Sequence, residues 1–190
     1  MPNLVIIFGP PAAGKAAVGA ELAALTGYRF FHNHLTADPA AALFGWGGER
    51  FARSVDAIRD VLLREAASDT SISGVIFTFV WGIGLPDDAA LMKKISGLFA
   101  DGGGQVFFLE LLASLKTRIS REGTEFRIAL KAAHRDVEAA RARQVEFEGK
   151  YVFNTDGRLP LNYPHLVLDT ETLSPVDAAQ RIKIALTAAP

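Results

Sequence analysis

A glycine-rich turn between an apolar run and a helical pattern constrains this chain most. Residues 4–8 read LVIIF, which predicts a fully buried strand, and residues 15–26 have the periodicity of a helix. In such a turn, backbone N–H groups and the positive helix N-terminus converge on an anion, and glycines let the chain approach it closely. We therefore predict a polyphosphate-binding loop in which Lys15 reaches the β- and γ-phosphates; the loop reads Gly9-Pro10-Pro11-Ala12-Ala13-Gly14-Lys15.

The position after the lysine departs from the usual motif. Ser or Thr is normal there, because its hydroxyl ligates Mg²⁺, but this chain has Ala16 followed by Ala17. Either the metal is held through water and other groups, or the protein binds nucleotide without efficient phosphoryl transfer. A strand-to-helix turn with no ligand is the third interpretation, and the well-placed strand and helix make it the weakest.

Composition narrows the class of protein. The chain has 190 residues, 49% of them hydrophobic, which fits one domain over residues 1–190. The net charge of −1 indicates no general attraction to nucleic acid or to a membrane surface. The chain has no cysteine, which excludes disulfides and thiolate chemistry. With no apolar run of membrane-spanning length and no leader pattern, we expect a cytoplasmic protein. Its oligomeric state is left open.

Strand and helix patterns alternate along the chain, which favours a parallel sheet covered on both faces. Further strands are expected at residues 28–31, 74–80, 105–109 and 164–169. Residues 35–48 are expected to form a loop with a helical turn at 39–44. A longer helix then turns Phe51, Val55, Ile58 and Leu62 inward, and a helix opening at Pro86 buries Leu91, Ile95 and Leu98. Residues 112–143 are predicted to be largely helical and basic, with a break near Gly123.

The chain resembles the small P-loop kinases, both the shikimate-kinase-like and the adenylate-kinase-like groups, and more narrowly a bacterial subgroup of unassigned substrate. Besides the phosphate loop, the letters that carry this resemblance are Gly27-Tyr28, Phe31-His32-Asn33-His34-Leu35-Thr36, Phe77-Thr78-Phe79-Val80-Trp81, Asp169-Thr170 and Leu173-Ser174-Pro175. The resemblance implies a P-loop NTPase fold of class α/β: a five-stranded parallel sheet in the order 2-3-1-4-5, flanked by helices. It also implies an ATP donor and a mobile helical lid at about residues 118–136.

Basic residues of the lid segment are candidates for binding the triphosphate. Arg118 and Arg121 share a helix face, and Arg127 begins a stripe that continues with Lys131 and Arg135 if that stretch is helical. In related kinases, arginines of this segment close over the phosphates. The plainer interpretation is a solvated helix face whose cations pair with nearby carboxylates. By the same resemblance, Thr170 lies in a loop that touches the adenine ring mainly through its backbone.

The sequence His32-Asn33-His34 follows the second strand, where the related kinases usually place a carboxylate. The carboxyl end of a parallel strand faces the ligand crevice, so His32, Asn33 and His34 are candidate acceptor-binding residues. A neutral imidazole acts as a base near pH 7 or hydrogen-bonds an acceptor hydroxyl. Asp38 is the nearest carboxylate and an alternative base. Histidines that merely cap a strand end are the plainer interpretation.

Other residues suit the acceptor pocket. Trp81 ends the third strand beside glycines and suits a pocket floor, and Trp46 covers the same pocket from a loop. Arg53 begins the following helix and suits an anionic acceptor, although pairing with Glu49 explains it equally. Edge-of-core packing is the alternative for both tryptophans.

Together these features predict an ATP-dependent kinase of a small hydroxyl- or phosphate-bearing metabolite, with ATP and Mg²⁺ as its cofactors. A nucleotide-binding module with weak or no catalysis is the first alternative, because Ala16 lacks a hydroxyl and no carboxylate follows the second strand. A kinase-like fold that serves as an interaction partner is the second. Nucleotide and a small molecule are the expected partners, and nucleic acid is not expected.

Overall fold

The computed structural model describes residues 1–122, 124 and 136–188. Its strands form one parallel sheet in the order β2-β3-β1-β4-β5, which confirms the predicted topology. The strands are β1 (Asn3–Phe8), β2 (Arg29–His32), β3 (Gly74–Phe79), β4 (Val106–Leu112) and β5 (His165–Asp169). The described helices are α1 (Lys15–Thr26), α2 (His34–Phe44), α3 (Gly48–Ser68), α4 (Pro86–Ala100), α5 (Leu115–Ser120), α7 (Val137–Lys150) and α8 (Pro175–Ala188).

Strand β1 is central because both of its faces are apolar. Ile6 pairs in register with Phe77 of β3 on one side and Phe108 of β4 on the other. Side chains that alternate along β1 enter two separate cores, one on each face of the sheet. A strand buried on both faces needs helices above and below it, which the alternating pattern had predicted.

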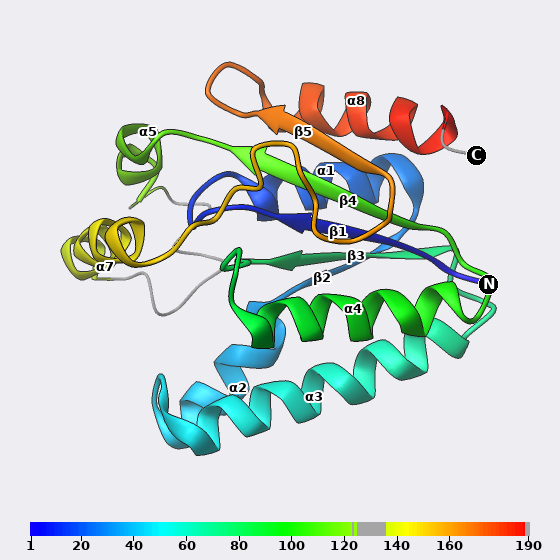
Figure 1. Cartoon of the computed structure of the whole chain (residues 1–190), viewed down its shortest axis with the longest axis horizontal. Coiled ribbons are helices and arrows are strands. Elements are labelled where there is room, and N and C mark those ends of the chain that lie inside the picture. The colour runs from blue at the N-terminus through cyan, green and yellow to red at the C-terminus, as the bar shows by residue number, and fades with distance from the viewer. Residues whose placement is uncertain (123, 125–135, 189–190) are drawn as a thin grey trace.

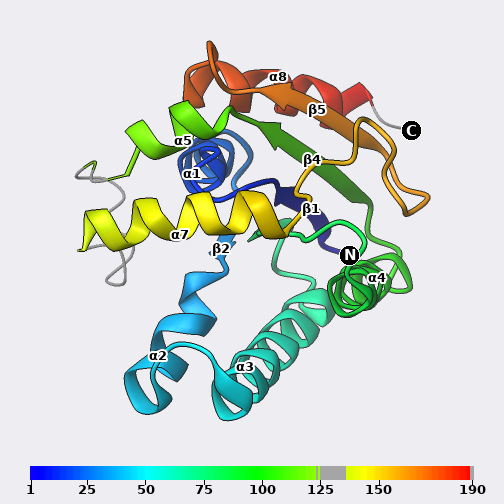
Figure 2. The same cartoon turned by 60° about the vertical axis from the view of Figure 1, so that its left-hand side comes forward.

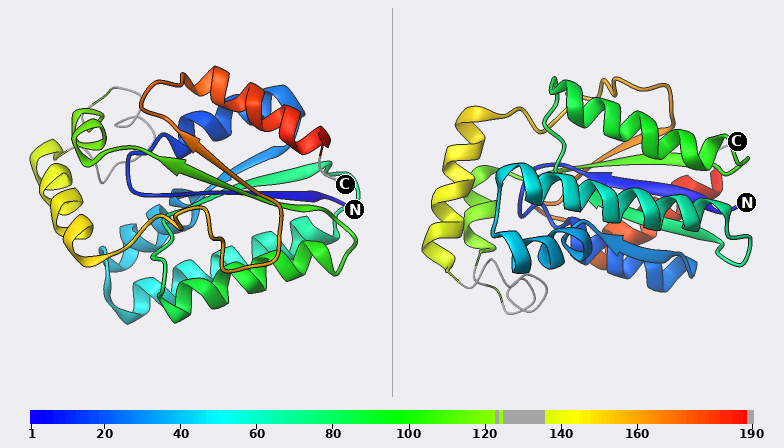
Figure 3. Two further views of the ribbon diagram at one scale, coloured as in Figure 1. Left: turned by 45° about the horizontal axis from the view of Figure 1, so that its top comes forward. Right: turned by 90° about the horizontal axis from the view of Figure 1, so that it is seen from below.

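Helices cover the two faces of the sheet in pairs. Helices α1 and α8 lie on one face, and α3 and α4 lie on the other (Figure 1). Beside α4, the segment between α7 and β5 crosses the sheet, where Tyr163 stacks on Phe108 with ring centroids 5.7 Å apart (Figure 3). The segment thus takes the place of a helix over β4.

The carboxyl edge of the sheet carries the remaining elements. Helices α5 and α7 lie at this edge in Figure 1, and α2 with the start of α3 projects from it in Figure 2. The loop after β1 lies at the same edge, so the elements that the sequence singled out meet there.

The loop prediction for residues 35–48 is wrong in part. Helix α2 begins already at His34, because the Asn33 carbonyl oxygen accepts hydrogen bonds from the backbone N–H groups of Thr36 (3.1 Å) and Ala37 (3.3 Å). Pro39 lies inside this helix with its side chain exposed, so its ring meets no packed neighbour. The predicted helical turn at 39–44 forms the second half of α2, which contains Pro39 although proline supplies no backbone donor.

The buried face of α3 differs from the predicted one by one residue. Leu62 is 47% exposed, and Leu63 is buried in its place. The buried stripe runs through Val55, Arg59 and Leu63, so an arginine occupies the middle of an apolar face. The ion pair between Glu49 and Arg53 is confirmed, with their charged groups 3.3 Å apart. Asp60 and Arg64 form a second pair, also at 3.3 Å.

Two further boundaries differ from expectation. Strand β4 continues to Leu112, which carries Glu110 into the sheet, and α7 continues to Lys150. Helix α5 ends at Ser120, before Gly123. In the part of the chain that the structure describes, no helix combines the length and apolar character that a membrane crossing requires.

Candidate functional site

The phosphate loop joins β1 to α1 with the backbone shape that its glycines allow. Gly9 has φ +136°, and a Cβ there would lie 2.4 Å from the carbonyl oxygen of Leu111, so only glycine fits against β4. Gly14 caps α1 with φ 93°. Ala12 also has a positive φ of 62°, a conformation that costs a non-glycine residue about 1–2 kcal/mol. Strained backbone of this kind concentrates at ligand-binding loops.

Lys15 begins α1 and turns back over the loop. Its Nζ donates hydrogen bonds to the carbonyl oxygens of Gly9 (2.8 Å) and Pro10 (2.6 Å). The amine therefore lies over the loop, where a phosphate oxygen accepts from it after a small side-chain rotation. The N–H groups of Ala16 and Ala17 lie in the first turn of α1, and such groups have no acceptor within their own helix. The loop thus fits a polyphosphate.

The residues around Ala16 suit a metal ion less well than the loop suits a polyphosphate. Ala16 has no ligand atom, and among the described residues no group of three or more His, Asp or Glu side chains is placed to hold a metal ion. Thr78, on the neighbouring strand β3, instead accepts a hydrogen bond from the Asn33 N–H with its hydroxyl oxygen (3.4 Å). A magnesium ion would depend on phosphate oxygens and water.

Arg121 joins the phosphate loop to the end of β5. Its Nη1 donates to the carbonyl oxygen of Ala12 (3.4 Å) and to Oγ1 of Thr170 (3.2 Å), and its Nη2 donates to the Thr170 carbonyl oxygen (2.6 Å). The Thr170 hydroxyl also lies 3.0 Å from the Ala13 carbonyl oxygen. Three residues proposed for nucleotide binding, Lys15, Arg121 and Thr170, therefore lie around one loop.

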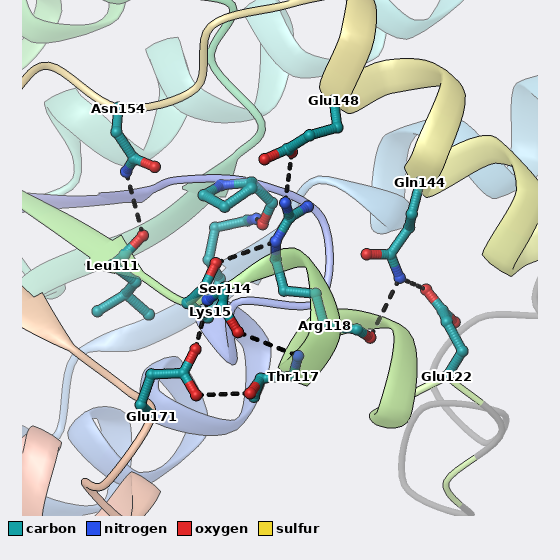
Figure 4. A network of polar contacts seen from close by, with 12 residues as sticks. Lys15, Leu111, Ser114, Thr117, Arg118, Glu122, Gln144, Glu148, Asn154 and Glu171 are labelled. Atoms are coloured by element: carbon teal, nitrogen blue, oxygen red, sulfur yellow. Dashed lines mark hydrogen bonds and ion pairs between the residues drawn. The ribbon is translucent and has the colours of Figure 1, made fainter.

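Arg118 lies deeper than its predicted role implies. The residue is 1% exposed; its Nε donates to the Ala113 carbonyl oxygen (3.1 Å), and its Nη2 pairs with Glu148 of α7 (Figure 4). Nη1 is buried with no hydrogen-bond partner among the described residues. The side chain borders a cavity of about 210 Å³ whose wall includes Pro10 of the phosphate loop. In this conformation Arg118 ties α5 to α7 next to the loop.

Gln144 and Glu122 strengthen the same junction. The Gln144 side-chain amide donates to the Glu122 carboxylate and to the Arg118 carbonyl oxygen (3.3 Å), and both side chains are buried (Figure 4). Helices α5 and α7 flank the stretch that contains Arg127, Lys131 and Arg135. These three candidates lie outside the described residues.

Glu171 caps the start of α5 from the loop after β5. Its carboxylate accepts hydrogen bonds from the Thr117 hydroxyl and from both the side chain and the backbone N–H of Ser114 (Figure 4). These bonds, led by the one from Thr117, lower the pKa of Glu171 to about 2. The cap links the end of β5 to the helix that carries Arg118.

The histidine sequence forms a second cluster at the same edge. His34 Nδ1 lies 3.0 Å from Asp38 Oδ1, one helical turn later on α2, and its ring contacts Trp46 with centroids 5.7 Å apart. A carboxylate at Nδ1 places the proton there, which leaves Nε2 as a proton acceptor. Asp38 therefore orients His34. Sequence analysis had treated the two residues as alternative bases and had not predicted this contact between them.

Helices α2, α3 and α4 enclose a cavity of about 630 Å³ beside this cluster. Asn33 and Trp46 border it, as does Phe79 at the end of β3. A cavity of this volume is in the range of small-molecule sites. Asn33 and Phe79 place one end of it near the edge of the sheet that carries the phosphate loop, and most of the remaining lining lies between α3 and α4.

Sequence analysis missed Arg59, which lines this cavity. The residue is 4% exposed; Nη1 pairs with Asp56 (2.9 Å), and Nη2 donates to Asn33 Oδ1 (2.9 Å). Its guanidinium carbon lies 5.6 Å from the centroid of Phe79, within reach of a cation–π interaction. Burial lowers the pKa of Arg59 from its ordinary value, and Asp56 opposes this shift. The sequence signal that could have indicated its burial is its spacing, because Arg59 lies one helical turn from both Val55 and Leu63.

Asp88 is the second lining residue without a predicted role. Its Oδ2 accepts a hydrogen bond from the Gly82 N–H (2.8 Å), and burial raises its pKa. Asp88 lies in the first turn of α4, where a carboxylate interacts favourably with the helix dipole.

Four predicted acceptor-site residues are not part of the cavity lining: Trp81, Arg53, His32 and His34. Trp81 is fully buried and packs edge-on against Phe8, with ring centroids 5.2 Å apart, so it supports the core under the site. Arg53 pairs with Glu49, and its side chain is 71% exposed. His32 shares a strand face with Phe30, which packs on α1, so it lies on the other side of the sheet from the cavity.

Glu110 forms a buried polar cluster that sequence analysis missed. Its carboxylate accepts from the side-chain amide of Asn154 (2.9 Å), from the Thr155 N–H (2.8 Å) and from the Thr155 hydroxyl, and His165 Nε2 lies 3.1 Å away. Desolvation lowers the pKa of His165. The cluster fixes the segment after α7 to the sheet next to the phosphate loop.

Solved structures with this architecture span the whole chain. A protein of Chloroflexus aurantiacus for which a kinase function has been suggested aligns with a TM-score of 0.64 at 21% identity, covering 100% of this chain and 98% of its own. A gluconokinase of Sinorhizobium meliloti aligns with a TM-score of 0.60 at 15% identity, covering 98% of this chain and 93% of its own. A shikimate kinase of Acinetobacter baumannii, solved with shikimate, aligns with a TM-score of 0.54 at 20% identity, covering 99% of this chain and 94% of its own.

The fold is that of the small P-loop kinases. The phosphate loop occupies the position that this fold requires, after the central strand and before the first helix. No protein-family model matches the sequence, and no curated protein is significantly similar to it. The likeness to P-loop kinases therefore establishes the architecture alone.

Proposed function

We propose that the protein is an ATP-dependent kinase that transfers the γ-phosphoryl group to a small molecule. The observation that carries the proposal is the pairing of two sites at one edge of the sheet. A phosphate loop with its lysine lies after β1, and a cavity of about 630 Å³ lies beside the ends of β2 and β3. Phosphoryl transfer chiefly needs two substrates held in line and charge stabilised between them.

ATP fits the loop side of this edge. Its phosphates would accept hydrogen bonds from the N–H groups of the first turn of α1 and from Lys15, and the helix dipole would favour their charge. Arg121 already lies against the loop at Ala12 and would reach the phosphates by exchanging its carbonyl contacts. The adenine would lie beside the loop after Thr170, and Arg127 would add charge from the lid.

Mg²⁺ would bind mainly to the nucleotide. Ala16 supplies no hydroxyl, so water and phosphate oxygens would complete the coordination shell. The ion would neutralise phosphate charge, and no described side chain is assigned to it.

We propose that His34, which follows the cavity residue Asn33 in the chain, removes the proton of the acceptor. Asp38 holds Nδ1–H, so Nε2 would accept the proton from an acceptor hydroxyl as its oxygen bonds to the γ-phosphorus. The bond between that phosphorus and the bridging oxygen breaks, ADP leaves, and His34 returns the proton to water. Asn33 and the cavity walls would orient the acceptor.

A nucleotide-binding module with weak catalysis is the second candidate. It is favoured by Ala16, which lacks the metal-binding hydroxyl of the motif, and by the absence of a carboxylate among the residues at 32–34. Such a protein would bind ATP but transfer no phosphate.

The variant Lys15→Ala separates the kinase from both alternatives. ADP release by the wild-type protein with Mg²⁺-ATP and an acceptor panel should fall by about 100-fold or more in the variant, because a charge that stabilises the transferring phosphoryl group is lost. Lys93→Ala, an exposed residue of α4, is the control. Equal transfer by Lys15→Ala and wild type, both folded by circular dichroism, would refute the mechanism.

A further inference from the structure

The cavity between α2, α3 and α4 has a charge distribution that disfavours an anionic acceptor. Carboxylates outnumber cations along its wall, and one of the cations is already compensated: Lys94 Nζ lies 2.6 Å from Asp60 Oδ1. The charged lining residues are Asp56, Asp60, Asp87 and Asp88 against Arg59 and Lys94. An incoming carboxylate would therefore meet net negative charge.

Arg59 does not reverse this balance, because its charge already has partners. Asp56 and Asn33 take its two Nη atoms at 2.9 Å each, and the ring of Phe79 lies 5.6 Å away. A carboxylate would have to displace Asp56, a neighbour on the same helix. Two like charges sharing one arginine in a partly buried site are unfavourable.

The Nε atom of Arg59 is left without a partner in the described part of the chain. This Nε is buried and has no hydrogen-bond partner among the described residues, although the side chain borders the cavity. A single oxygen would satisfy this donor, and leaving a buried donor unsatisfied is costly. A ligand hydroxyl would suit both neighbours once the Arg59 side chain turns Nε toward the cavity, since its oxygen would accept from Nε and its hydrogen would donate to a carboxylate such as Asp88.

The remaining walls suit a compact polar ring or chain with an apolar side. Trp46 is 52% exposed at this cavity and lies 5.3 Å from Phe51, centroid to centroid. Aromatic faces together with a few carboxylate and guanidinium groups can bind C–H faces and hydroxyl groups of one molecule at once.

We propose that this cavity takes an uncharged polyhydroxyl compound as phosphoryl acceptor and discriminates against carboxylic acids of the same skeleton. The inference rests on the kinase function proposed above and names the substrate class of that site. An acceptor hydroxyl forms the new O–P bond, the bond from the γ-phosphorus to the bridging oxygen breaks, and the hydroxyl proton passes to His34 and then to water. ADP is the leaving group.

Matched alcohol and acid pairs test the proposal directly. Sorbitol and gluconate differ at one terminal carbon, as do xylitol and xylonate, and each is assayed for ADP release with Mg²⁺-ATP and for thermal stabilisation of the protein. The alcohol of a pair should exceed the acid in kcat/KM by at least about tenfold, as expected for one unfavourable charge contact. Preference for the acid, or no response to any alcohol by a protein that binds ATP, would overturn it. A protein that fails to bind ATP would instead overturn the kinase function.

A charge-removing variant tests the cause of the preference. Asp88→Asn keeps an oxygen that accepts from the Gly82 N–H and removes one negative charge from the wall. The ratio of alcohol to acid, in activity or binding, should fall by about fivefold or more. Asp101→Asn, exposed at the end of α4, should leave the ratio unchanged. An unchanged ratio in folded Asp88→Asn would overturn the electrostatic basis of the proposal.

Discussion

Lys15 begins α1 after the central strand and His34 begins α2 after β2, and each has contacts that hold its side chain in place. The Lys15 amine is held at the loop carbonyl oxygens, and the His34 ring is held at Asp38. In both cases the side chain is positioned by protein groups before a ligand binds. Preorganisation of this kind is what positioning catalysis requires.

We predict different effects of substituting the two residues of the His34–Asp38 pair. With an acceptor present, His34→Gln should lower kcat by about 100-fold or more, because the general base is lost. Asp38→Asn should lower kcat less and alter the pH profile of the rate, since it changes the tautomer and basicity of His34. Glu65→Gln, exposed on α3, is the control. An unaltered pH profile in both His34→Gln and Asp38→Asn would remove the base assignment.

At the scale of elements, α5 and α7 behave as one unit fastened by Arg118. Glu148→Gln removes the carboxylate partner of a guanidinium that is almost fully buried. Because the Glu148 side chain is 43% exposed, we expect a loss of about 1–3 kcal/mol in the free energy of unfolding, below the value for a fully buried pair. Urea denaturation measures it, with Glu146→Gln on the same helix as control; equal stability would show that the pair is weak.

The Glu171 cap gives α5 a pH dependence of known sign. Its folded-state pKa of about 2 lies below the ordinary value, so the unfolded chain binds this proton more readily. The cap therefore stabilises the fold above about pH 4.5 and loses this effect as the pH falls toward 2. Wild type should have a higher Tm than Glu171→Gln at pH 7, and the difference should shrink below pH 4.5. A difference independent of pH would contradict the assignment.

Local patterns were sufficient to predict the strands and the phosphate loop. Periodicity and glycines act over a few residues, and the resemblance supplied the order of the strands in the sheet. The buried charges were not predictable in the same way. Arg59 is stabilised by Asn33, and Glu110 by Asn154 and Thr155, which are remote in the chain. A sequence identifies such residues as charged, but their burial depends on partners that only the fold brings together.

Trp81 illustrates the same limit for an aromatic residue. Its place at the end of a strand suits a pocket, but Phe8 and Phe108 enclose it in the core. The deciding contacts come from neighbouring strands, and strand position alone does not indicate which side chain fills the space above the sheet.

At the scale of the whole molecule, the account requires that nucleotide binding stabilises the fold through the loop after β1. The loop contacts β4 at Leu111 and the end of β5 through Arg121 and Thr170, so a ligand there is linked to several strands. Binding to the native state alone raises stability by about 2.7 kcal/mol at a hundredfold excess over Kd.

The most direct test is a thermal-shift titration with ATP, with and without Mg²⁺, on wild type and Lys15→Ala. The account predicts a rise in Tm of about 5–10 °C for wild type, larger with Mg²⁺ and mostly lost in the variant. A rise indifferent to the metal would favour a nucleotide-binding module over a kinase. No rise with ATP, ADP or GTP would contradict the central claim that this loop binds a nucleotide.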